Sequence, residues 1–119
     1  MELKRSYVKA AMVAGGILSA LALGVNAASA ASAAEGQKLA FNRSKGNCIT
    51  CHEIKGGTNM GNVGPVLNDM KKRFPRNELY AIIFDETKRN PHTVMPPFGR
   101  NLILTHSEIE SIIDFLYTR

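Results

Sequence analysis

The most constraining feature of the sequence is a pair of cysteines followed directly by a histidine. Residues 48–52 read CITCH, which is the C-x-x-C-H pattern of covalent haem attachment. Cysteines three residues apart on a helical turn project to the same side, so both sulfurs can bond to one porphyrin edge while the next residue lies beneath the ring. The motif predicts one haem c, bound covalently by Cys48 and Cys51, with His52 as an axial ligand of the iron.

Three other interpretations of the cysteine pair fit the chain less well. A disulfide would close a loop of only four residues and would constrain the unfolded chain too little to stabilise the domain by much. A structural zinc site needs four protein ligands, yet the chain has no further cysteine and its other histidines, His92 and His106, lie far away in sequence. A thioredoxin-like site needs a βαβ framework, and no alternating strand pattern flanks the motif.

Residues 1–34 have the layout of a secretory signal peptide. Three positive charges, at Lys4, Arg5 and Lys9, precede an uncharged apolar run over residues 10–25, and small residues with A-x-A cleavage sites follow. The run is shorter than the roughly 20 apolar residues of a spanning helix, so we expect cleavage near Glu35 rather than anchoring. The mature protein is predicted to be exported, with no membrane attachment after cleavage.

Residues 35–119 are then a single domain of 85 residues, which is short for a fold stabilised by side-chain burial alone. A covalently attached haem would supply an apolar body around which such a chain can fold. The domain has 12 Lys and Arg against 9 Asp and Glu, a net charge of +3. No sustained basic patch carries interleaved aromatic residues, so nucleic acid is not expected as a partner.

The spacing of apolar residues predicts an all-α domain. One helix is expected over residues 35–43 and a second after Pro75, ending before Pro91. The last helix is the best defined, because Thr105 and Glu108 form a capping box ahead of it. Apolar residues then recur at helical spacing to the C-terminus, namely Ile109, Ile112, Ile113 and Leu116. No segment alternates as a strand, and we expect the two terminal helices to cross beside the haem.

The second axial ligand is predicted to be Met95. It lies 43 residues beyond His52 and is followed by two prolines, which exclude regular helix and give a stiff loop for a weak neutral ligand. Met60 and Met70 follow the motif too closely to reach the opposite face of the haem easily. His92 is the alternative ligand, although a histidine beside proline in a polar turn is more often exposed.

Two further segments have open interpretations. A metal-bound imidazole normally donates its other ring proton to a carbonyl, which Pro65 could supply for His52, but the spacing is equally compatible with an ordinary turn. The basic cluster Lys71-Lys72-Arg73, with Arg76 nearby, is more often a solvated helix face, while docking to a redox partner is the other hypothesis.

The mature chain resembles class I c-type cytochromes over its whole length, and more narrowly the SoxX family. The narrower likeness lies in four segments in the right order: RSKGNC at residues 43–48, NVGP at 62–65, MKKRFP at 70–75 and NPHTVMPPFG at 90–99. The resemblance implies His52 and Met95 as axial ligands and Pro65 as the carbonyl partner of His52. It also implies a periplasmic heterodimer with the cytochrome subunit SoxA.

The resemblance further implies a role in thiosulfate oxidation. In that family the SoxAX complex oxidatively couples thiosulfate to a cysteine of the carrier SoxYZ, as an L-cysteine S-thiosulfotransferase, and the covalent chemistry is assigned to the SoxA haem. This chain would be the non-catalytic subunit that accepts electrons from SoxA and passes them to a downstream acceptor cytochrome. The alternatives are a free periplasmic electron carrier and a haem sensor with an open iron site.

Overall fold

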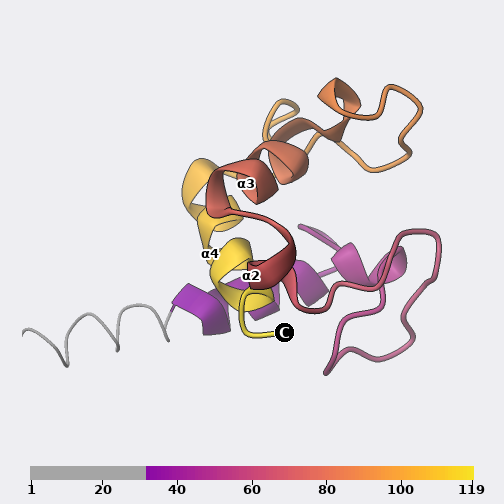
Figure 1. Ribbon diagram of the computed structural model, residues 1–119. Coiled ribbons are helices and arrows are strands. Elements are labelled where there is room, and N and C mark those ends of the chain that lie inside the picture. Colours follow the sequence, from indigo (N-terminus) through magenta and orange to yellow (C-terminus); the bar gives the residue numbers. More distant parts are fainter. Residues whose placement is uncertain (1–31) are drawn as a thin grey trace, which may run out of the picture.

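The computed structural model describes residues 32–119, and all regular structure within this range is helical (Figure 1). The predicted signal peptide, residues 1–34, lies outside the described residues except for its last three. A helix over residues 32–41 comes first. It is followed by η1 (Cys48–Thr50), α2 (Met70–Arg73), α3 (Arg76–Asp85), η2 (Glu86–Lys88) and α4 (His106–Leu116). Across residues 32–119, none of these helices combines the length and the apolar character needed to span a bilayer.

The N-terminal helix, residues 32–41, crosses α4 in backbone contact. Gly36 is buried, and a Cβ at this position would lie 1.8 Å from the carbonyl oxygen of Ser111, so only glycine permits the approach. Farther along, the rings of Phe41 and Phe115 meet edge to face with centroids 5.5 Å apart, a favourable aromatic geometry. The predicted crossing of the terminal helices is confirmed, and the first helix, which was expected over residues 35–43, ends at residue 41.

The capping box predicted at the start of α4 is present. The Thr105 side chain accepts a hydrogen bond from the Glu108 amide, and the Glu108 carboxylate accepts one of 2.8 Å from the Thr105 amide. These bonds satisfy two donors that a helix start otherwise leaves without partners. The Thr105 amide and the ammonium group of Lys45, 2.9 Å away, hold the pKa of Glu108 below its usual range. The predicted apolar face of α4 is buried in the core, at Ile109, Ile112, Ile113 and Leu116.

Helix α3 follows Pro75, as predicted, and packs against α4. Its buried residues include Leu79 and Ile83, and at its start Arg76 forms ion pairs with Glu110 and Asp114 of α4. The α-helix ends at Asp85 and gives way to the single turn of η2. The prediction of a helix between Pro75 and Pro91 is thus confirmed in position, and the helix is shorter than that interval.

Two long irregular segments connect the helices, residues 51–69 between η1 and α2 and residues 89–104 between η2 and α4. Figure 1 shows both segments extending from the same side of the helices. In the chain, the first precedes α2 and the second follows α3. The predicted all-α cytochrome c fold agrees with this arrangement. The helices form the core, and the two segments carry most of the residues expected to bind the haem.

We predict that Gly36→Ala disrupts the crossing of the terminal helices. The new methyl group would meet the Ser111 backbone, and overpacking of this kind costs about 2–3 kcal/mol of unfolding free energy, more than the gain in helix propensity. Lys38→Ala, at an exposed position of the same helix, should stay within about 0.5 kcal/mol of the wild type. Denaturant unfolding of the two holoproteins tests this, and equal midpoints would contradict the close contact.

Candidate haem-binding site

The two cysteines lie on one tight helical turn. Cys48 begins η1, and its carbonyl accepts hydrogen bonds from the amides of Cys51 at 3.2 Å and His52 at 2.9 Å. Ile49, between the cysteines, is buried in the core and anchors the turn. Both thiols are free and half-buried, and desolvation raises the pKa of Cys48 to about 11.

The His52 imidazole is oriented by the segment that folds back beside it. Its Nδ1 lies 2.7 Å from the carbonyl oxygen of Pro65, and because a carbonyl can only accept, Nδ1 must carry the proton. The other ring nitrogen, Nε2, then has its lone pair available for a metal. A Cβ on Gly64 would lie 2.3 Å from Cε1 of His52, so glycine is required where the ring passes. The hydrogen bond that the SoxX resemblance implied for Pro65 is present in the structure.

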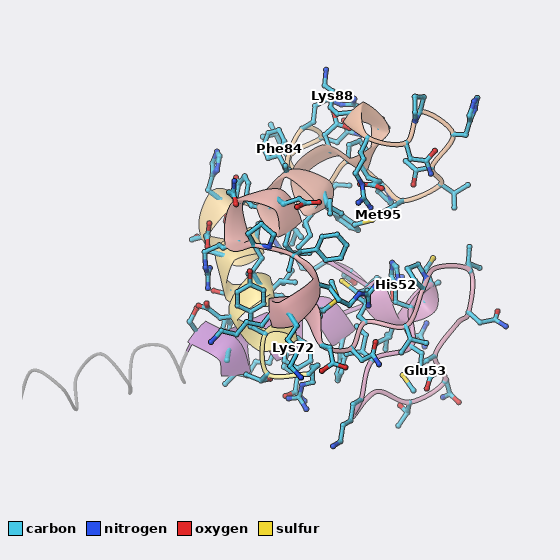
Figure 2. All side chains as sticks on the ribbon, viewed as in Figure 1. His52, Glu53, Lys72, Phe84, Lys88 and Met95 are labelled. Atoms are coloured by element: carbon cyan, nitrogen blue, oxygen red, sulfur yellow. The ribbon has the colours of Figure 1, made fainter. Side chains whose placement is uncertain are left out.

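Met95 lies on the segment opposite His52. Figure 2 shows the two residues on the facing segments 89–104 and 51–69. The Met95 side chain is half-buried and packs against the core cluster, and its amide donates a hydrogen bond of 3.1 Å to the Thr93 hydroxyl. The structure thus brings a thioether and an imidazole to the same region from positions far apart in sequence.

Met60 and Met70, which were predicted to be less suitable ligands than Met95, have sulfurs that contact other parts of the protein. The sulfur of Met60 accepts a hydrogen bond of 3.1 Å from the Ile54 amide, and Met70 is buried in the core on α2. Within residues 32–119 the sulfur of Met95 has no hydrogen-bond partner. His92, the alternative ligand, is exposed. Met95 is therefore the candidate whose donor atom is both sheltered and available.

The surroundings of these residues fit a large apolar cofactor. Leu67 and Phe74 are half-buried beside the core, while three valines on the two facing segments are exposed, Val63 at 69%, Val66 at 45% and Val94 at 78%. Imidazole nitrogen and thioether sulfur are a donor set typical of haem iron in electron-transfer cytochromes. Two thiols on one turn, these donors and uncovered aliphatic side chains together match a covalently attached haem.

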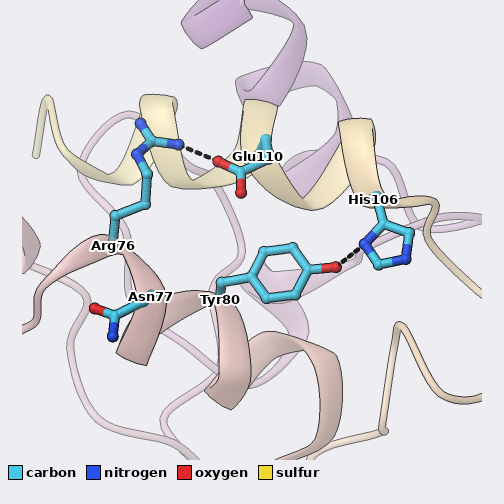
Figure 3. A pocket seen from close by; sticks show the side chains of 5 residues that line it. All are labelled: Arg76, Asn77, Tyr80, His106 and Glu110. Atoms are coloured by element: carbon cyan, nitrogen blue, oxygen red, sulfur yellow. Dashed lines mark hydrogen bonds and ion pairs between the residues drawn. The ribbon is translucent and has the colours of Figure 1, made fainter.

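Two hollows on the surface of the described residues are lined by other residues. One of about 600 Å³ lies between α3 and α4 and is lined by Arg76, Asn77, Tyr80, His106 and Glu110 (Figure 3). None of the predicted haem residues lines it. His106 is the first residue of α4, as predicted, and its Nδ1 contacts the Tyr80 hydroxyl. Burial and then the charge of Glu110 raise the pKa of Tyr80 above its usual value.

One residue of the basic cluster at residues 71–73 has a structural role that the sequence does not reveal. Arg73 donates hydrogen bonds to the backbone carbonyls of Val66 at 3.0 Å and Asn68 at 3.2 Å. Lys72 is exposed and pairs with Asp69 at 3.4 Å. Arg73 therefore fixes the end of the segment that carries Pro65, and sequence reasoning missed this role because charge runs give no sign of a backbone partner.

The sequence matches the cytochrome c family over residues 33–119. The chain belongs to the cytochrome c family, whose members bind haem c covalently through C-x-x-C-H and transfer electrons. This confirms the predicted fold and the predicted class of protein.

Among solved structures, the chain is similar to SoxXA from P. pantotrophus. The TM-score is 0.64, and the match covers 71% of this chain and 78% of that chain at 24% identity. Similarity at this level shows a shared fold, in agreement with the likeness that the sequence segments indicated. No curated protein gives a significant match to the chain.

Proposed function

We propose that this protein is an exported monohaem cytochrome in which Cys48 and Cys51 hold the haem and His52 and Met95 are the axial ligands. The observation that carries this proposal is the geometry around His52. Its imidazole follows the cysteine turn directly, is held at Nδ1 by the Pro65 carbonyl at 2.7 Å, and lies opposite the available thioether of Met95.

The bound haem supplies a one-electron redox centre, and the protein residues tune it. The Pro65 carbonyl fixes the tautomer and orientation of His52 and makes the ligating nitrogen more basic. The thioether of Met95 favours the reduced iron and gives a higher potential than a second imidazole would. Both axial positions of the iron would be filled and both cysteines would be bonded to the haem. No open site for substrate chemistry would remain, which suits electron transfer.

We further propose that the protein is the SoxX-type subunit of a SoxAX complex in the periplasm. Support comes from the four sequence segments shared with that family and from the fold shared with SoxXA of P. pantotrophus. In this role the protein accepts electrons from SoxA while thiosulfate is coupled to a cysteine of SoxYZ, and it passes them to a downstream cytochrome. A free periplasmic carrier is the alternative that the tests below separate.

Covalent attachment of one haem is the first prediction. Protein exported by a host competent in cytochrome c maturation should keep its pigment after denaturation and show a mass increase of one haem. Cys48→Ala should retain haem through the remaining thioether, and the double variant Cys48→Ala/Cys51→Ala should lose it under denaturing conditions. Mass spectrometry of the denatured proteins measures this, and an unmodified mass for the matured wild type would contradict the proposal.

The ligand role of Met95 gives a second prediction. In the wild type, an external ligand can bind only to the minor conformers in which the thioether has left the iron, and such states are typically populated at 0.1–10%. Met95→Leu should therefore make carbon monoxide bind the ferrous protein about ten- to a thousandfold faster, and should lower the reduction potential. Met60→Leu is the matched control and should bind carbon monoxide as slowly as the wild type. Rapid binding by the wild type itself would show that Met95 is not a firm ligand.

Association with a larger cytochrome gives the third prediction. Co-expressed with the exported SoxA-type cytochrome of its own organism, a SoxX-type subunit should co-elute with it in size-exclusion chromatography at both low and high salt, because a stable heterodimer does not depend on weak surface charge alone. A free carrier should instead elute alone at high salt. Elution as a monomer under both conditions would contradict the subunit assignment and leave the electron-transfer assignment standing.

A further inference from the structure

The chain between Asp85 and Arg100, here the Met95 segment, begins and ends at one polar cluster. Asp85, the last residue of α3, is only 4% exposed. Its carboxylate accepts hydrogen bonds from the Arg100 guanidinium at 2.8 Å and from the Thr87 amide at 3.2 Å, as well as from the Thr87 hydroxyl. Arg100 also donates to the Thr87 hydroxyl at 3.1 Å. The hydroxyl of Thr87, and next the charge of Arg100, hold the pKa of Asp85 below its usual range.

The backbone at the same place reinforces this closure. The amides of Gly99 and Arg100 both donate to the carbonyl oxygen of Phe84, at 3.1 and 3.2 Å. A Cβ on Gly99 would lie 2.0 Å from Cδ2 of Phe84, so the chain returning from Met95 passes directly against this ring. The end of α3 therefore forms a fixed base to which both ends of the segment are attached.

The hydrogen bonds near the tip of the segment are local by comparison. The Thr93 amide donates to the Asn90 carbonyl at 3.0 Å, and the Met95 amide donates to the Thr93 hydroxyl. Such bonds shape the turn but do not tie it to the helices. Within the described residues, the hydrogen bonds that fix the tip relative to the core are those at its base.

We propose that Asp85, Thr87 and Arg100 form a clamp that holds the Met95 segment closed and so keeps the thioether of Met95 on the haem iron. The inference rests on the proposed axial role of Met95. Arg100 and Thr87 are positioning residues, since neither is assigned to the iron. Arg100 is 48% exposed, so its substitution removes the clamp while leaving the apolar core unchanged.

The alternative is that Arg100 contributes only to general stability, as a surface ion pair would. The chain offers a matched control in Arg76, whose side chain is 44% exposed and whose guanidinium pairs with Glu110 and Asp114 between α3 and α4 (Figure 3). Arg76 touches no residue of the Met95 segment in these pairs. Comparing Arg100→Ala with Arg76→Ala therefore separates ligand positioning from stability.

The experiment titrates the ferric holoproteins with imidazole and follows the weak red absorption band that ferric haem shows only with a sulfur ligand. Apparent affinity for an external ligand scales with the fraction of molecules whose iron is open. Arg100→Ala should bind imidazole about tenfold more tightly than the wild type and should show a weaker band, whereas Arg76→Ala should match the wild type in both. Arg100→Lys, which keeps the charge, should recover part of the effect.

Thr87→Val is a second, milder variant that tests the clamp if Arg100→Ala does not fold. It removes the hydrogen bonds of the hydroxyl and leaves the Asp85–Arg100 pair in place. It should increase imidazole affinity by a smaller factor than Arg100→Ala. Equal imidazole affinity for Arg100→Ala, Thr87→Val and Arg76→Ala would overturn the clamp. Absence of the sulfur band in the wild type would instead overturn Met95 as a ligand, and the clamp with it, so the two failures are distinguishable.

Discussion

The backbone contact between Gly36 and Ser111 is the constraint on which the rest of the structure depends. It joins the two ends of the domain, so the residues between them must leave the helices and return. Closing so long a loop is entropically costly, and the buried apolar face of α4 together with the Phe41–Phe115 contact offsets that cost. The two irregular segments are then held on one side of the helices, where His52 and Met95 come to face each other.

Features determined by neighbouring residues were predicted well from the sequence. The cysteine turn, the capping box at Thr105 and the apolar face of α4 each depend on spacings of three or four residues, and all three are found in the structure. The position of α3 was predicted from the spacing of apolar residues after Pro75. The end of the first helix was predicted less accurately, because tertiary packing rather than local signals decides where it lies.

Features that depend on distant residues could not be predicted in the same way. Gly36 looks like an unfavourable residue within a helix, and only its contact with Ser111 explains it. Arg73 appeared to be one charge of a basic cluster, yet its partners are backbone carbonyls at Val66 and Asn68. The pairing of Asp85 with Arg100 likewise joins residues that no motif connects. Spacing along the sequence identifies which side chains are suited to bind a metal. The contacts that hold those side chains in place come from residues distant in sequence, and spacing does not reveal them.

The two proposed ligands therefore depend on the fold to different degrees. His52 follows Cys51 directly, so covalent attachment would keep it near the iron even when much of the domain is open, and Pro65 needs only to orient it. Met95 has no such tether, and a thioether is a weak neutral ligand, so its place depends on how firmly its segment is closed. It follows that loosening the base of this segment would alter the iron site before it altered the helices. A protein that must transfer electrons without reacting with small ligands needs its tertiary contacts on the methionine side, which is where the Asp85–Arg100 pair lies.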